Sequence, residues 1–109
     1  MAYKNNTAVM KSSTEEVYVG NYGSEWLEFM HSNHPDLVEQ MIENNSLMAV
    51  AQSVDDRAWK YRELLDTQYA KCHPRPTKYE DVVRWEKTRM FYTDGEVMRD
   101  KVLVVVTQP

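Results

Sequence analysis

Apolar residues recur every three or four positions along most of this chain, and this spacing predicts a mostly α-helical protein. The clearest stretch starts after Ser46 and keeps the spacing for about six turns. Its apolar side is formed by Leu47, Val50, Val54, Ala58, Tyr61, Leu65 and Tyr69. The sequence His73-Pro74-Arg75-Pro76-Thr77 must end this helix, because proline has no N–H to donate and disfavours the α conformation of the residue before it.

A second long helix is expected after Thr77, which stands three residues before Glu80 in the spacing of a capping box. Apolar residues then repeat every seven positions, at Val83, Met90, Val97 and Val104 and beside them at Phe91, Met98 and Val105. Two long helices joined by a short loop predict an antiparallel helical hairpin. An alternative stays open, in which Thr93-Asp94-Gly95 forms a turn between two strands, because the β-branched run from Val102 to Val106 favours a strand.

Two shorter helices are expected upstream, packed on this hairpin. Ser24 is placed to cap the first, which should end near Asn33, and Pro35 suits the first turn of the second, which Asn44-Asn45 should end. Before them, residues 15–19 are expected to form a short extended segment and residues 1–14 a flexible leader. Residues 15–109 are expected to form a single helical domain.

The composition is that of one small domain whose charge is unevenly distributed. The chain has 109 residues, 42% of them apolar, and a net charge of −4, which argues against the uniformly basic face of a duplex-DNA-binding protein. Residues 15–66 contain 11 acidic and 3 basic side chains, whereas residues 71–89 contain 6 basic and 3 acidic ones. The single cysteine, the absence of an export signal and the absence of a long apolar run predict a cytoplasmic protein that does not enter a membrane.

No catalytic centre, metal site or cofactor site is expected. With three glycines in all, the chain has no phosphate-binding loop, dinucleotide fingerprint or nucleophile elbow. Cys72 and His73 are adjacent on a predicted helix, so their side chains should diverge and not act as nucleophile and base. His31 and His34 do not combine with this pair in the spacing of a structural zinc site. We therefore expect the protein not to be an enzyme.

Charged and aromatic residues suggest binding surfaces instead. An acidic set would suit a basic protein surface, such as that of a nuclease or a recombinase, and consists of Glu25, Glu28, Asp36, Glu39 and Glu43. A basic set would suit phosphates, with Tyr79 and Trp85 placed to stack on single-stranded bases, and consists of Lys71, Arg75, Lys78, Arg84 and Lys87. The twelve aromatic residues exceed what the buried sides of the helices need, so some should be exposed and favour a protein partner or a homodimer.

One stretch of the chain has a recognisable order of motifs. It contains Gly20-Asn21-Tyr22-Gly23, Leu27-Glu28-Phe29-Met30, His34-Pro35, Met41-Ile42, Asn45-Ser46-Leu47 and Asp55 to Ala58. In this order the chain resembles the TnpV family of small proteins carried on bacterial transposons. The likeness is closest over residues 19–58 and beyond them depends on Trp85 and an apolar C-terminal segment. The resemblance implies a cytoplasmic accessory protein of a mobile genetic element.

The resemblance does not imply a reaction, so the function is inferred from the residues. Non-covalent binding of a protein partner, in a regulatory role, is preferred because the net charge opposes nucleic acid. Two alternatives stay open: an anti-CRISPR-type inhibitor that blocks a host nuclease through the acidic set, and a recombination accessory factor that contacts nucleic acid through the basic set.

Overall fold

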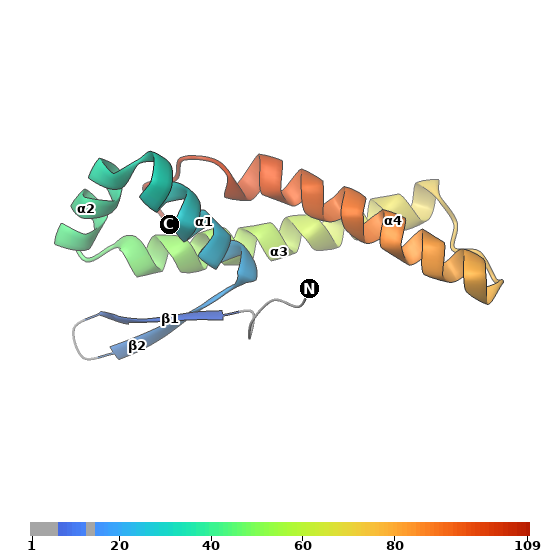
Figure 1. The fold of residues 1–109 in the computed structure, drawn as a ribbon, viewed down its shortest axis with the longest axis horizontal. Helices are drawn as coiled ribbons and strands as arrows, with labels where there is room; N and C mark the ends of the chain where they lie inside the picture. Colours follow the sequence, from blue (N-terminus) through green and yellow to red (C-terminus); the bar gives the residue numbers. More distant parts are fainter. Residues whose placement is uncertain (1–6, 13–14) are drawn as a thin grey trace.

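The computed structural model describes residues 7–12 and 15–109, most of which are helical (Figure 1). The helices are α1 (Asn21–Asn33), α2 (Pro35–Glu43), α3 (Leu47–Cys72) and α4 (Tyr79–Val97), and α4 continues directly into a short π-helix, η1 (Met98–Val102). Two strands, β1 (Thr7–Ser12) and β2 (Glu15–Gly20), precede them and pair antiparallel, with Thr7 opposite Gly20. The predicted mostly α fold is confirmed.

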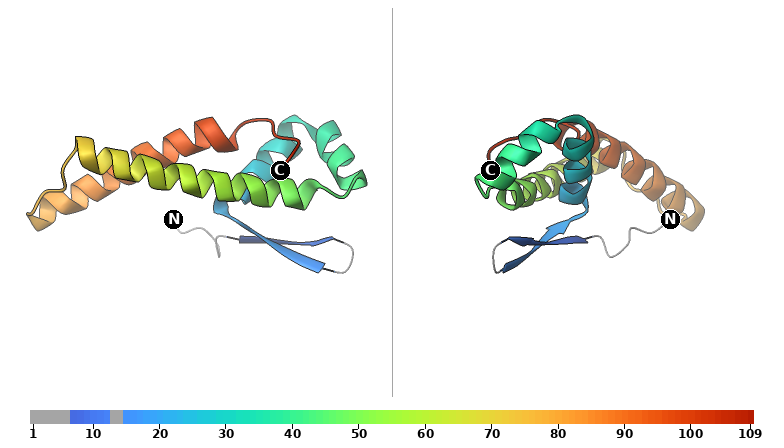
Figure 2. Two further views of the ribbon diagram at one scale, coloured as in Figure 1. Left: turned by 180° about the vertical axis from the view of Figure 1, so that it is seen from behind. Right: turned by 60° about the vertical axis from the view of Figure 1, so that its left-hand side comes forward.

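The molecule is elongated, with principal extents of 53 × 23 × 20 Å, and α3 runs along much of its length (Figure 2). The first half of α3 packs against α1, α2, β2 and η1, whereas its second half packs against α4 alone. We call residues 19–61 and 97–109 the head and residues 62–96 the arm. The predicted antiparallel hairpin is present, and the two short helices cover only the half of α3 that lies in the head.

The apolar core is concentrated in the head. Its buried members there are Val19, Tyr22, Trp26, Leu27, Met30, Val38, Met41, Leu47, Met48, Val50, Ala51, Val54, Ala58, Val97 and Val102. Leu65 is the one buried apolar side chain that the described part of the arm contributes. The predicted apolar side of α3 is confirmed for its five aliphatic residues, all of which are buried. Its two tyrosines are only partly buried.

Helix α1 begins earlier than predicted. Gly20 is its N-cap, and Asn21, Tyr22 and Gly23 form its first turn, so the prediction that Ser24 caps the helix was wrong. The physical reason lies in a distant residue. Asp55 on α3 accepts a hydrogen bond from the Gly23 N–H (3.0 Å), which supplies from another helix the acceptor that an N-cap side chain usually provides.

Helices α2 and α3 end where predicted, but the N-caps of the two long helices, α3 and α4, differ from the predictions. Asn45, just after the C-cap of α2, has a positive φ of 63°. This left-handed conformation ends the helix and turns the chain toward α3. Ser46 stands at the N-cap of α3, but its side chain accepts no hydrogen bond from the N–H groups of the helix, and its hydroxyl donates to Asn44 Oδ1 (2.5 Å) instead. Helix α4 is preceded by Lys78 as N-cap, so the capping box expected from Thr77 does not form.

The face that α4 turns toward α3 also differs from the prediction. Of the seven-residue repeats, only Val97 is buried, while Met90 is 48% exposed and Phe91 84% exposed. The side of α4 that faces the rest of the molecule is formed by residues four apart, namely Arg89, Thr93 and Val97. The prediction was wrong because it used apolar residues alone, and this helix turns an arginine and a threonine inward.

The last part of the chain corrects two further expectations. Gly95 lies inside α4, and after β2 the described residues contain no strand, so the alternative with a turn at Thr93-Asp94-Gly95 was wrong. The helix nevertheless stops short of Val104 and Val105, which follow η1 as irregular backbone. There the Trp26 indole N–H donates to the Val104 carbonyl (3.2 Å), a contact that turns the segment back over α1.

The N-terminal segment is extended, as predicted for residues 15–19, and pairs with a second strand that was not predicted. The hairpin of β1 and β2 lies along α1 and α3 (Figure 1). Of the expected leader, residues 7–12 form β1, while residues 1–6 and 13–14 lie outside the described residues.

Candidate functional site

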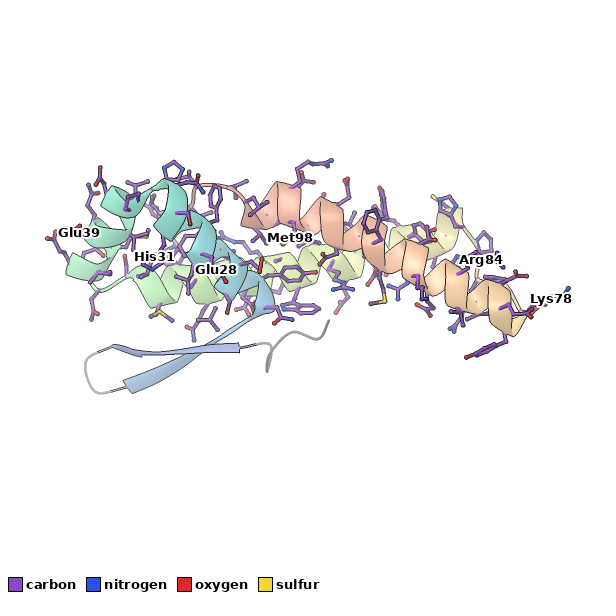
Figure 3. The ribbon with its side chains drawn as sticks, in the orientation of Figure 1. Glu28, His31, Glu39, Lys78, Arg84 and Met98 are labelled. Atoms are coloured by element: carbon purple, nitrogen blue, oxygen red, sulfur yellow. The ribbon has the colours of Figure 1, made fainter. Side chains whose placement is uncertain are left out.

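The acidic set lies at the head end of the molecule. Glu25 and Glu28 are on α1, and Figure 3 shows Glu28 and Glu39 projecting from α1 and α2. Glu25 is half-buried, and the other four carboxylates are exposed. None of the five forms an ion pair with a residue that the structure describes. The structure therefore places the set on two adjoining helices, where no cation among the described side chains is close enough to pair with it.

The basic set lies at the opposite end, around the loop that joins α3 to α4, where Figure 3 shows Lys78 and Arg84. All five side chains are exposed, but two of them are paired: Arg75 lies 3.4 Å from Glu86, and Arg84 lies 3.0 Å from Asp81. The three lysines of the set have no ion pair to any described residue. The positive charge free to attract phosphate is thus smaller than the sequence indicated.

An ion-pair seam joins the two helices of the arm, and it consists of Asp66, Arg75, Glu86 and Arg89. The Arg89 guanidinium lies 2.6 Å from Asp66 Oδ1 on α3 and donates to Glu86 Oε1 on α4 at 2.5 Å. This hydrogen bond from Arg89, more than any other cause, lowers the pKa of Glu86. Arg89 occupies the inward position that an apolar residue would usually fill, so electrostatic contacts replace apolar packing along this part of the hairpin.

Trp85 is engaged within the arm. Its indole N–H donates to the His73 carbonyl (2.7 Å), and the guanidinium groups of Arg75 (5.9 Å) and Arg89 (5.7 Å) both lie near its ring. Tyr69 packs against the same ring at 5.7 Å between centroids. Trp85 therefore closes the hairpin next to the proline loop and does not lie open for base stacking, unlike Tyr79, which is 81% exposed.

Two tyrosines of the head form long-range hydrogen bonds near the base of the arm, Tyr22 to residues of the arm and Tyr61 within the head, and sequence reasoning missed both. The Tyr22 hydroxyl donates to Asp94 (2.7 Å) and accepts from Arg62 (2.9 Å), and its burial is the main cause that raises its pKa. Tyr61 donates to Asp100 (2.7 Å). These partners are 72 and 39 residues apart in the chain, so no local motif could reveal them.

A groove of about 450 Å³ opens between α3 and α4 on one side of the arm. It is lined by Leu65, Gln68, Tyr69, Cys72, His73, Thr88 and Tyr92. Tyr69 stands near the rings of His73 (4.5 Å) and Tyr92 (5.8 Å), which gives the groove an aromatic wall. Cys72 is a free, exposed thiol at its edge.

The outer face of α4 carries large apolar side chains that nothing in the described part of the chain covers. Phe91 is 84% exposed and Met90 is 48% exposed. On α3 and at the start of α4, Trp59 (44%) and Tyr79 (81%) are exposed as well, which confirms the prediction that some aromatic residues reach the surface. Solvent-facing aromatic rings on a small helical protein are typical of contact surfaces.

The three histidines and the cysteine, which were not expected to form a zinc site, lie in two separate parts of the fold. His31 and His34 are at the end of α1, in the head, and Cys72 and His73 are at the end of α3, in the arm. Within the described ranges, no three side chains of the types histidine, cysteine, aspartate and glutamate come together in a way that would hold a metal ion. None of the described helices has the length and apolar content that crossing a bilayer requires.

Comparison with known proteins identifies the family. The model of the family described as transposon-encoded protein TnpV matches residues 6–94, which is most of the chain. The chain belongs to the TnpV family. No curated protein and no solved structure matches it. Family membership indicates a transposon-encoded accessory protein, and the match extends well beyond residues 19–58, where the resemblance was closest.

Part of the family match forms a close crossing of α1 and α3. Gly20 and Gly23 of the first motif face Asp55 of the last, and a Cβ on Gly20 would lie 2.7 Å from Asp55 Oδ2. A Cβ on Gly23 would overlap Cγ1 of Val19 and lie 2.8 Å from the Ala51 carbonyl oxygen. These residues of the TnpV pattern therefore act in the fold, by letting α1 cross α3 closely and by capping α1 from α3.

Proposed function

We propose that this TnpV protein is a cytoplasmic, non-enzymatic accessory protein of its mobile element, and that it acts by binding a protein partner non-covalently through the acidic end of the head. The observation that supports this most is the set of exposed carboxylates on α1 and α2, which have no ion pair within the described part of the chain. Unpaired surface charge of one sign steers association with a surface of the opposite sign.

The partner inferred from this charge is a basic protein that itself handles nucleic acid, such as a recombinase or a nuclease. Its basic groove would accept carboxylates where it otherwise accepts phosphates. Regulation of such an enzyme is the role that we propose. Inhibition of a host nuclease, as by an anti-CRISPR protein, is the second candidate, and it is favoured by the same carboxylates.

Affinity capture from a bacterial lysate tests the proposal when three forms of the protein are compared. Each capture is carried out with and without nuclease treatment of the lysate. The test variant is Glu39→Lys/Glu43→Lys on α2. The control is Asp56→Lys/Glu63→Lys on α3, which changes the net charge equally at two exposed positions outside the acidic set.

We expect the wild type and the control to retain the same protein after nuclease treatment, and the test variant to lose it, more completely at higher salt. Retention that disappears with nuclease treatment would instead favour the nucleic-acid alternative through Lys71, Lys78 and Lys87. Equal retention by all three forms contradicts a role for the α2 carboxylates. A retained nuclease whose cleavage activity falls on addition of the wild type would select inhibition over regulation of a recombinase.

A further inference from the structure

The arm carries a projecting ring and a hollow next to each other. Phe91, 84% exposed, lies three residues after Thr88 and one before Tyr92, and both of these line the groove between α3 and α4. Residues three apart are neighbours on a helix surface, so the ring stands beside the rim of the groove and not inside it. A surface with a projection beside a hollow can pair with a copy of itself, each ring entering the other hollow.

Gly95 adds a second observation on the same helix. It lies one turn beyond Phe91 inside α4, and a Cβ built on it would meet no atom of the described chain within 4 Å. Its φ is not positive, so the backbone of α4 does not require glycine here. Glycine weakens a helix relative to alanine and allows another backbone to approach closely. The absence of a side chain at this position leaves room for the backbone of another chain to approach α4 closely.

Charge decides how two copies would be oriented. The head carries the acidic set, and the far end of the arm carries Lys71 and Lys78, of which Figure 3 labels Lys78, without ion pairs to described residues. A parallel pair would bring like charges together at both ends, whereas an antiparallel pair brings opposite charges together. Lys78 precedes Phe91 by 13 residues in the chain, about 20 Å along a helix. In an antiparallel pair this reach brings the arm end of one copy alongside the head of the other.

We propose that the outer face of α4 is the interface of an antiparallel homodimer, in which Phe91 of each copy enters the α3–α4 groove of the other and Gly95 marks the closest approach of the two α4 helices. The interface is isologous, so each residue in it contributes twice. This proposal does not depend on the binding partner of the acidic head. That partner is tested through Glu39 and Glu43 on α2, which lies at the end of the molecule away from α4 (Figure 1).

Sedimentation equilibrium over a range of concentrations tests the interface. We expect the wild type to dimerise and Phe91→Ser to weaken the dimer by about 30-fold, because an aromatic residue that fills a partner pocket is a typical hot spot. Gly95→Ala should also weaken it, although alanine favours the folded helix, so misfolding cannot account for the loss. Ile42→Ser on α2 is the matched control, because Ile42 is a large exposed residue (55%) remote from the arm.

A charge-reversal cycle tests the orientation in the same instrument. Lys71→Glu/Lys78→Glu at the arm end and Glu25→Lys/Glu28→Lys on α1 should each weaken the dimer, and their combination should restore it, because opposite charges then meet again. A combination weaker than either double variant overturns the antiparallel arrangement. A wild type that stays monomeric into the millimolar range overturns the whole proposal, and then a foreign protein or a nucleic acid is the occupant of the face. A dimer unaffected by both Phe91→Ser and Gly95→Ala overturns it as well.

Discussion

Gly23 and Gly95 both lie inside helices, yet replacing each by alanine should change stability in opposite directions. Alanine is favoured over glycine in a helix interior by about 1 kcal/mol. At Gly95 the added methyl group would meet no described atom within 4 Å. Gly95→Ala should therefore increase the free energy of unfolding by about 0.5–1 kcal/mol, largely by restricting the unfolded chain.

The methyl group of Gly23→Ala has no such room. It would overlap Cγ1 of Val19, which is only 1% exposed, and lie 2.8 Å from the Ala51 carbonyl oxygen, which belongs to the backbone of α3. Helix α1 would have to move away from α3 and stretch the hydrogen bond from the Gly23 N–H to Asp55. Overpacking costs about 1–3 kcal/mol and a hydrogen bond to a charged group contributes about 1.5–3 kcal/mol. Set against the gain in helix propensity, the net loss should be about 2 kcal/mol.

Urea unfolding followed by circular dichroism, at concentrations low enough to avoid association, measures both effects by linear extrapolation. Thermal unfolding should show the same order, with Gly23→Ala lowering Tm by roughly 10 °C. The reasoning is refuted if Gly23→Ala is as stable as the wild type, or if the two variants shift stability in the same direction. Either result would mean that α1 does not cross α3 at the distance that the structure shows.

Three further outcomes follow from the electrostatic contacts. Asp55→Ala should lose about 2 kcal/mol because the Gly23 N–H loses a charged acceptor, whereas Asp56→Ala, one residue on and exposed, should change little in the same urea assay. Arg89→Met should cost about 1–2 kcal/mol, since it leaves Asp66 and Glu86 without their shared cation in a partly exposed site; a stability equal to wild type in thermal unfolding would contradict the seam. Because Arg89 lowers the pKa of Glu86 in the folded state, ionised Glu86 stabilises the fold above its unfolded pKa, and this contribution is lost as pH falls through the lowered value; Glu86→Gln should therefore flatten the acid limb of the stability profile.

The sequence predicted those parts of the fold that depend on apolar spacing or on proline. On α3, the aliphatic residues from Leu47 to Leu65 are buried at the expected intervals. The proline loop after Cys72 ends the helix where expected. The facing side of α4 could not be found in this way, because Arg89 and Thr93 occupy positions that a search for apolar residues leaves out.

Contacts between distant residues account for most of the other differences. Helix α1 starts at Asn21 because Asp55, 32 residues beyond Gly23, caps it, and a local motif at Ser24 cannot compete with this acceptor. The β-branched run near the C-terminus has high strand propensity, but no strand among the described residues pairs with it, and the Trp26 indole N–H donates to the Val104 carbonyl. Tertiary partners, and not propensity, decide both segments.

The candidate surfaces were predictable in position but not in strength. Net charge by segment places the acidic set in the head and the basic set at the arm end, as the structure has them. The pairing of Arg75 with Glu86 and of Arg84 with Asp81 depends on side-chain geometry, which the sequence does not specify. The groove beside Phe91 depends on how α3 and α4 cross, and spacing along either helix alone does not reveal it.

The length of the α3–α4 hairpin can change without altering the core of the head. Between Leu65 and Thr93 no side chain is buried, so the far portion of the arm adds nothing to the core. Inserting or deleting about seven residues in each of α3 and α4 would add or remove about two turns and keep the remaining side chains in phase. A variant with a longer or shorter arm would therefore keep the same head, and the length of the arm would set the distance between partners bound at the two ends of the molecule.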